Sequence, residues 1–113
     1  MPAEWEPHVA TWIAWPHHEP DWPGKLDAIR WVYAEIVRTL GGTTERIEIL
    51  CHDDAVRADA ATALAAHDVA PSAYRLHLVP TDRAWLRDSA PTGVLSDGAG
   101  EPPASLVRWR FNA

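Results

Sequence analysis

Apolar and polar residues alternate along this chain with periods that predict helices and strands in turn. The clearest period predicts a helix over Lys25–Leu40, which the Gly41-Gly42 pair ends. On one side of its helical wheel lie the apolar residues Leu26, Ile29, Tyr33, Ile36, Val37 and Leu40. Trp31 projects from the polar side of the wheel, so the sequence alone offers its ring no partner.

Short apolar runs predict three strands around this helix. Ala10–Trp15 is apolar and ends at Pro16, which cannot donate a backbone hydrogen bond. His17–Gly24 is rich in proline and glycine, so we expect a loop there. Arg46–Cys51 and Tyr74–Val79 are the other two strands, and a proline directly follows the second of them.

A second helix and a hairpin complete the predicted fold. The helix is expected near Ala55–Ala66, an alanine-rich segment that Asp53 or Asp54 can cap. Thr92–Leu95 and Leu106–Phe111 predict two more strands, joined by the turn-rich segment SDGAGEPP. The order strand, helix, strand, helix, strand and hairpin is typical of an α/β fold, here with mixed sheet pairing.

The composition is that of an ordinary globular domain. The 113 residues are 47% apolar and 23% charged, and this length suits one domain or less. Sixteen acidic residues against ten Lys and Arg give a net charge of −6, so we expect no nucleic acid or anionic membrane as partner. We also expect no secretion signal, no membrane span and no disulfide framework, and the single cysteine fits a cytoplasmic location.

Tryptophan is unusually abundant and is concentrated in the N-terminal part of the chain. The chain has seven tryptophans, and four of them lie within the first 22 residues. A ring of this size is costly to keep in water, so such a density predicts either a core or a pocket with flat walls.

The segment Thr81–Pro91 (TDRAWLRDSAP) holds the densest group of chemically active side chains. It follows a predicted strand, a place where α/β proteins commonly carry reactive groups. If residues 85–88 are extended, Trp85 and Arg87 face away from Asp88; if they turn, Trp85 and Asp88 share a face. The turned form suits a flat cation, which would stack on the ring and bind the carboxylate. Alternatively, Arg87 and Asp88 form a local structural ion pair and Trp85 belongs to the core.

The histidine-rich loop raises the question of a metal site. Its candidate ligands are His8, His17, His18, Glu19 and Asp21. Neighbouring histidines do not easily bind one ion together, and the helical spacing of zinc motifs is missing. We therefore expect a solvated loop and no metal.

Cys51 is followed by His52, which raises the question of a nucleophilic Cys-His pair. Adjacent strand residues point to opposite faces, so we expect the thiol and the imidazole to lie apart. Cys51 is then a small buried apolar residue. Gly41-Gly42 follows a helix rather than preceding one, so no phosphate-binding loop is predicted.

Four segments, in order, resemble the N-terminal part of the agmatine deiminase family, which includes the bacterial peptidyl-arginine deiminases. They are Pro2–Pro16 (PAEWEPHVATWIAWP), Asp21–Leu26 (DWPGKL), Thr81–Pro91 and Trp109–Ala113 (WRFNA). The resemblance covers nearly the whole chain. It implies a pentein fold, a five-bladed α/β propeller, of which residues 1–113 would form the first blade and part of the second.

The resemblance also implies an activity. Family members hydrolyse a guanidino group to a ureido group and release ammonia, using a cysteine thiolate, a proton-shuttling histidine and two acids that hold the cationic nitrogens. Asp88 matches the guanidinium-binding aspartate of the family's W-x-R-D motif, and Trp85 matches the aromatic residue of the same pocket. Asp88 would thus be catalytic and substrate-binding, and Trp85 substrate-binding, with no cofactor. The substrate would be agmatine or an arginine-type guanidinium, and assembly into a homo-oligomer is left open.

Two departures from the family pattern limit this expectation. Ala90 stands where the family's R-D-S-G-P pattern has glycine. The family's nucleophilic cysteine and its histidine motif come later in the chain, so we expect an inactive, truncated part of a longer deiminase. The alternatives are a stand-alone, non-enzymatic module that binds guanidinium compounds or a protein partner, and a pentein acting on arginine or methylated arginine.

Overall fold

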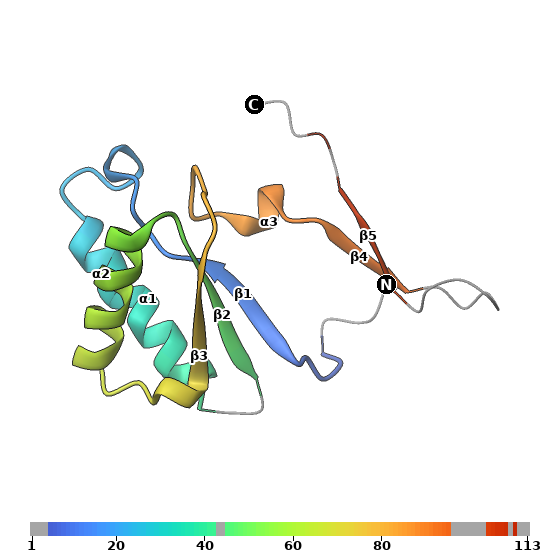
Figure 1. Cartoon of the computed structure of the whole chain (residues 1–113), viewed down its shortest axis with the longest axis horizontal. Coiled ribbons are helices and arrows are strands. Elements are labelled where there is room, and N and C mark those ends of the chain that lie inside the picture. The colour runs from blue at the N-terminus through green and yellow to red at the C-terminus, as the bar shows by residue number, and fades with distance from the viewer. Residues whose placement is uncertain (1–4, 43–44, 96–103, 109, 111–113) are drawn as a thin grey trace. The chain divides into compact units, whose positions relative to one another are not determined.

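The computed structural model describes residues 5–42, 45–95, 104–108 and 110. The chain divides into a larger compact unit, His8–Leu86, and a smaller one made of Met1–Pro7 and Arg87–Ala113. The elements of the larger unit in chain order are β1 (Ala10–Ala14), the 3-10 helix η1 (Glu19–Asp21), α1 (Leu26–Leu40), β2 (Arg46–Cys51), α2 (Asp54–Ala66), the 3-10 helix η2 (Pro71–Ala73) and β3 (Tyr74–Leu78) (Figure 1). Each predicted strand of this unit is confirmed to within one residue.

The strands β1, β2 and β3 form a parallel sheet in that order, and α1 and α2 are its crossovers. The register places Ile13 beside Ile49 and Ile49 beside Leu76. Both crossovers move across the sheet in the same direction, and such connections are right-handed, so both helices must lie on one face. Figure 1 shows α1 and α2 together on one side of the sheet. The helices of this unit therefore leave the opposite face uncovered.

The core of the larger unit lies between the sheet and its two helices. Alternation along β2 places Ile47, Ile49 and Cys51 on the helix-facing side, where all three are fully buried. The helices contribute Ala34, Val37, Val56, Ala60 and Leu64. Trp15, directly after β1, is fully buried as well, and its indole Nε1 donates a 2.8 Å hydrogen bond to Asp59 Oδ2.

Helix α1 confirms the predicted helix to within one residue, but its buried stripe differs from the predicted apolar side. Ala34 and Val37 are fully buried, whereas Ile36 and Leu40 are 37% and 40% exposed. Just past the end of the helix the packing is also tight, since a Cβ added at Gly41 would come within 2.9 Å of the Ala73 Cβ in η2. The fully buried positions of α1 are therefore two of its smaller side chains rather than its whole apolar side.

Helix α2 begins after Asp53, whose carboxylate accepts a 2.8 Å hydrogen bond from the backbone N–H of Val56. Of the two predicted caps, Asp53 is the one formed, because its extended backbone aims the carboxylate at the free N–H groups of the first turn. None of the helices in the described ranges is long and apolar enough to cross a membrane.

The smaller unit holds a hairpin of β4 (Thr92–Leu95) and β5 (Ala104–Val107), paired antiparallel with Thr92 opposite Val107. The prediction of β4 is confirmed, but the strand predicted over Leu106–Phe111 is wrong in position. Pairing with β4, rather than local apolar content, decides where β5 begins and ends. Phe111 and the predicted connecting turn lie outside the described residues. Within the described ranges the predicted mixed pairing occurs as two separate sheets, one parallel and one antiparallel.

Candidate functional site

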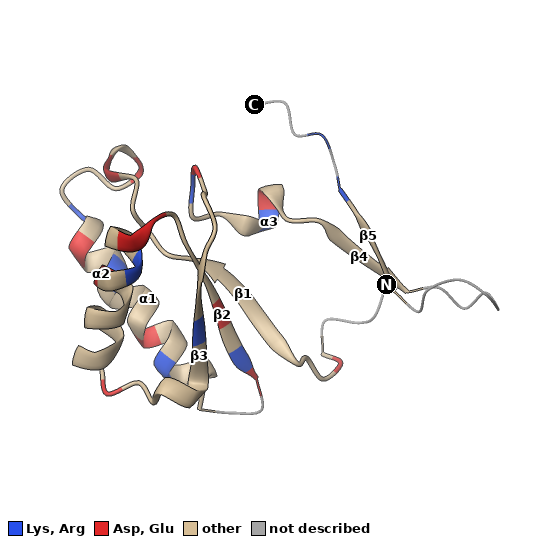
Figure 2. Cartoon of the chain, in the orientation of Figure 1, with Lys and Arg blue, Asp and Glu red and all other residues tan. Residues whose placement is uncertain are grey.

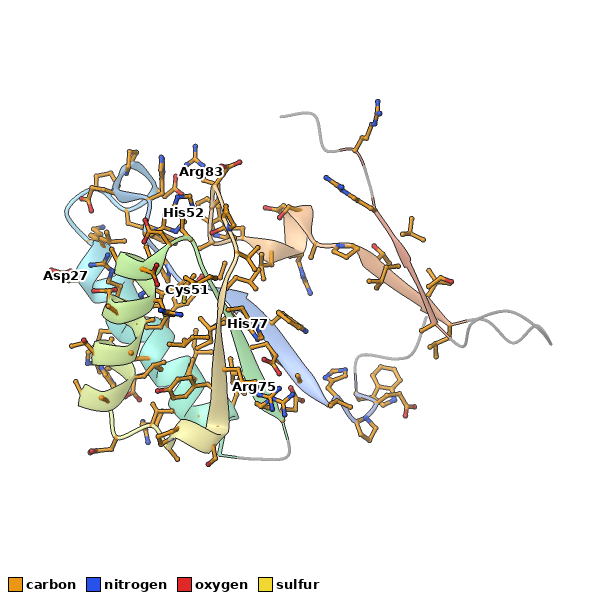
Figure 3. The ribbon with its side chains drawn as sticks, viewed as in Figure 1. Asp27, Cys51, His52, Arg75, His77 and Arg83 are labelled. Atoms are coloured by element: carbon orange, nitrogen blue, oxygen red, sulfur yellow. The ribbon has the colours of Figure 1, made fainter. Side chains whose placement is uncertain are left out.

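The candidate site lies at the carboxyl-terminal edge of the parallel sheet. The loops that follow β1, β2 and β3 cover residues 15–25, 52–53 and 79–85. Because the three strands are parallel, their following loops emerge at one edge, the edge at which α/β proteins usually bind ligands. Figure 3 shows His52 and Arg83 at this end of the larger unit. We call the following residues the loop cluster: His17, His18, Asp21, Trp22, His52, Thr81, Arg83 and Trp85.

Two histidines connect the three loops. The rings of His17 and His52 stack with their centroids 4.8 Å apart and their planes 16° apart. His52 Nδ1 accepts a 3.2 Å hydrogen bond from the backbone N–H of Thr81. His17 Nδ1 in turn lies 3.1 Å from the Trp15 carbonyl oxygen. The loop after β2 is thus held between the loops after β1 and β3.

Asp21 is the most buried charged residue of the loop cluster. Its side chain is only 5% exposed and forms an ion pair with Arg83, from the loop after β3. His18 Nδ1 lies 3.2 Å from Asp21 Oδ1 and 3.2 Å from Arg83 Nη1. The second carboxylate oxygen, Oδ2, is buried and has no hydrogen-bond partner among the described residues. Arg83 therefore provides the main compensation for a carboxylate that has left water.

Two tryptophans lie against each other in the same cluster. The rings of Trp22 and Trp85 lie with centroids 5.5 Å apart and planes inclined by 42°. Trp85 is 45% exposed, and Trp22 is partly buried. The alternative that Trp85 is a core residue is therefore wrong, because nearly half of its surface is in solvent. An indole that is packed on one side and open on the other can stack with a planar cation.

Asp88 lies in α3 (Leu86–Ser89), a single helical turn, and is exposed. Of the two conformations expected for residues 85–88, the turned one is formed over residues 86–88. Asp88 belongs to the smaller unit. Its role in guanidinium binding stays a prediction.

Cys51 does not have the properties of a nucleophile. The residue is fully buried in the core, and its Sγ lies 4.0 Å from the Ile49 carbonyl oxygen. Burial raises the pKa of the Cys51 thiol to about 11, although the charge of Arg57 acts in the opposite direction. His52 is held by Thr81 in the loop cluster instead. The expectation that Cys51 is a buried apolar residue, separate from His52, is confirmed.

The candidate metal ligands of the sequence are occupied by other contacts. His18 contacts Asp21 and Arg83, His17 stacks on His52, and His8 Nδ1 lies 3.4 Å from Glu45 Oε1. Within the part of the chain that the structure describes, no group of three His, Cys, Asp or Glu side chains is arranged to hold a metal ion.

Sequence reasoning missed most of the loop cluster. It considered Asp21 only as a metal ligand and His52 only as a partner of Cys51, and it assigned no role to Trp22 or Arg83. A signal for them exists, since each lies in a segment that follows a predicted strand. Had the predicted strands been taken as one parallel sheet, these segments would have been expected at a common edge.

The uncovered face of the sheet carries a second polar group, centred on Glu48. This residue is 4% exposed; one carboxylate oxygen lies 2.6 Å from Arg46 Nε and the other 2.6 Å from His77 Nε2. The hydrogen bond to His77 and, to a lesser degree, the one to Arg46 hold the pKa of Glu48 below its usual range, against the opposing effect of burial. Figure 2 shows acidic and basic positions next to one another on β2, and Figure 3 shows His77 on the side away from the helices. The ring of Trp12 lies 5.3 Å from that of His77.

The fold and the loop cluster define the structural class of this protein. It is an α/β protein with a parallel sheet, one layer of helices and a candidate site at the carboxyl-terminal edge of the sheet. A solved structure, the agmatine deiminase of C. jejuni, has this fold, with a TM-score of 0.68 at 17% identity over 90% of this chain and 28% of that one. Residues 1–113 match the Porphyromonas-type peptidyl-arginine deiminases, and the chain belongs to this family.

Curated relatives agree with this assignment. A putative agmatine deiminase of Selenomonas ruminantium is 34% identical over 113 residues, which is 100% of this chain and 29% of the relative. The agmatine deiminase of Stutzerimonas stutzeri is 34% identical over 115 residues, again 100% of this chain and 28% of the relative. The chain thus spans less than a third of the length of these relatives.

Proposed function

We propose that this chain is the N-terminal part, residues 1–113, of a guanidino-group hydrolase that acts on agmatine or an arginine-type guanidinium. The observation that carries the proposal is the family match over residues 1–113. It is supported by relatives named agmatine deiminase, of which the chain spans 28–29%. In the whole protein, this part would form the first blade and part of the second blade of a pentein propeller.

The reaction consumes water and a guanidinium and yields a ureido product and ammonium. A thiolate must attack the central guanidinium carbon, and the buried Cys51, with its raised thiol pKa, is unsuited to that step. The proposal therefore places the nucleophile outside this segment. The chain itself would bind substrate without a cofactor, as part of a cytoplasmic protein. Assembly into a homo-oligomer is compatible with this proposal but is not part of it.

Trp85 and Asp88 are the residues we propose to bind the guanidinium. A guanidinium stays protonated at any working pH, so it needs a carboxylate acceptor and a flat surface. The W-x-R-D motif supplies both residue types, and the half-exposed indole of Trp85 supports the stacking role. Asp88 would accept hydrogen bonds from the guanidinium nitrogens. These bonds would also fix the position of the central carbon that the thiolate attacks.

The test begins with the intact mass of the native protein and its turnover of agmatine and of an arginine-containing peptide. Ureido product and ammonia should appear in equal amounts, and Asp88→Asn should lower kcat/KM at least about a hundredfold because it removes one partner of an ion pair that substrate binding buries. Asp82→Asn changes another exposed aspartate of the same segment and should leave kcat/KM within about twofold. Equal activity of both variants would refute the assignment of Asp88.

The 113-residue chain alone is expected to show no turnover. Turnover by this chain would refute the placement of the nucleophile outside it. A native mass equal to that of 113 residues, together with saturable agmatine binding and no product, would instead support the non-enzymatic guanidinium-binding module. The contact between the half-exposed Trp85 and the partly buried Trp22 is the observation that favours this second candidate.

A further inference from the structure

We propose that Asp21 is a positioning residue: its ion pair with Arg83 holds the loop after β3 so that Trp85 packs on Trp22 and presents its open face to a guanidinium. The proposal rests on the proposed function only in its last step, the binding of the guanidinium. The clamp itself, Asp21 with Arg83, lies wholly within the larger unit.

Burial makes the clamp strong although Arg83 is itself half exposed. The Asp21 side chain is 5% exposed and the Arg83 side chain 52%. One carboxylate oxygen already lacks a hydrogen-bond partner among the described residues. Among the residues that the structure describes, loss of Arg83 would leave the buried charge with only the His18 ring beside it, which is costly. The pair is therefore expected to stay closed while most exposed ion pairs open freely.

The clamp acts on the segment that carries Trp85. Three alternate residues of this segment are each held by a neighbouring loop: Thr81 by His52, Arg83 by Asp21, and Trp85 by Trp22. Asp21 and Trp22 are adjacent, and Arg83 and Trp85 are two residues apart, so the ion pair and the ring contact join the same two loops. Without the ion pair, the hydrogen bond at Thr81 would still hold the start of the loop, but of these three contacts the weak ring contact alone would fix the part that carries Trp85.

A purely structural ion pair would give a different result from a positioning one. If Asp21 only stabilised the fold, its replacement would lower the unfolding midpoint and leave the ring geometry of the folded protein unchanged. If it positions Trp85, the folded protein itself would change: the two rings would separate, and the affinity for a planar cation would fall. The two roles can therefore be distinguished by a spectroscopic signal of the tryptophan pair.

The first experiment is circular dichroism on the 113-residue chain. Two indoles in contact give an exciton couplet in the far ultraviolet, and Trp22→Phe assigns the couplet by removing it. We expect Asp21→Asn and Arg83→Gln each to reduce the couplet by about half or more, because the ring contact depends on fixed relative orientation. Arg83→Lys keeps the charge and should largely restore it, and Asp82→Asn is the matched control that should leave it unchanged.

An unchanged couplet in folded Asp21→Asn would overturn the proposal. Should that variant fail to fold, Arg83→Gln decides the matter, because its side chain is half exposed and its removal leaves the core intact. An unchanged couplet in Arg83→Gln would then overturn the proposal in the same way.

The second experiment measures agmatine affinity by calorimetry on the same variants. Asp21→Asn and Arg83→Gln are each expected to weaken binding about tenfold, the loss for one displaced stacking contact, whereas Asp82→Asn should leave the affinity unchanged. The double variant Asp21→Asn/Arg83→Gln should lose no more affinity than the weaker-binding of the two single variants, because both substitutions remove the same ion pair. If the couplet falls while the affinity for agmatine stays unchanged, the clamp positions Trp85 but Trp85 does not bind the guanidinium, and that last step of the proposal is overturned. If the unaltered chain and the native protein both fail to bind agmatine, the proposed function fails, whereas the couplet still decides the clamp.

Discussion

Glu48 offers the most direct test of how the uncovered face of the sheet is stabilised. We expect Glu48→Gln to lower the free energy of unfolding at neutral pH by about 2 kcal/mol, since hydrogen bonds to charged groups contribute about 1.5–3 kcal/mol each. Both bonds of Glu48 are 2.6 Å long, and its side chain is 5% exposed. Glutamine keeps the shape and one acceptor, so the expected loss counts one of the two charged hydrogen bonds. We take the lower part of the range because Arg46 and His77 are 38% and 35% exposed.

The sign of the pH dependence follows from the lowered pKa of Glu48. A carboxyl group whose pKa is lower in the folded state contributes stability that is present above its unfolded pKa, here about 4.5. That contribution is lost as the pH falls through the folded-state pKa. Because glutamine does not titrate, the difference in unfolding free energy between the unaltered chain and Glu48→Gln should shrink as the pH falls through the folded-state pKa of Glu48.

Urea denaturation at neutral pH and at about pH 3 measures this deficit directly. Asp27→Asn is the control: Asp27 also forms an ion pair but is 99% exposed, so its replacement should change stability by less than about 0.5 kcal/mol. A deficit for Glu48→Gln as small as that of the control would refute the reasoning. So would a deficit that stays the same in acid.

Three further results are expected. The Cys51 thiol, with its pKa raised to about 11, should react with a thiol reagent in the unfolded chain far faster than in the native one, as followed by absorbance. Gly41→Ala should lower the free energy of unfolding by about 1–3 kcal/mol in denaturant titrations, since its Cβ would lie 2.8–2.9 Å from neighbouring atoms, whereas Gly42→Ala, at 3.7 Å, should be nearly neutral. Asp53→Ala removes the cap of α2 and should cost about 1 kcal/mol, seen as a lower thermal midpoint.

The two candidate substrate residues show how far sequence patterns reach. The motif around Trp85 and Asp88 directs attention to the correct segment, because residue types and their spacing are local properties. The exposure of Trp85 could not be predicted, since it depends on Trp22, which approaches from a loop far away in the sequence. The same holds for Asp21, whose burial becomes apparent only once Arg83 is placed against it.

Trp15 and Trp31 make the same point for the fold. Both are large apolar residues in predicted elements, yet Trp15 is fully buried and Trp31 is 59% exposed, with its ring 5.5 Å from that of His67. Position along a strand or a helical wheel suggests a face but does not say which neighbour covers it. For α1 the neighbours are β2 and α2, whose buried residues form one core with Ala34 and Val37.

The sequence by itself determined the order of β1, α1, β2, α2, β3 and β4 and their bounds to within one residue, and through its motifs the family. These follow from the periods of backbone geometry and from local capping, which need no distant partner. The tertiary structure alone decided that two sheets form, which face of the first one the helices leave uncovered, and that Asp21 meets Arg83 while Glu48 meets His77. The physical reason is that ion pairs and ring contacts depend on which loops and strands come together, and packing and strand direction set this over distances that no local pattern records.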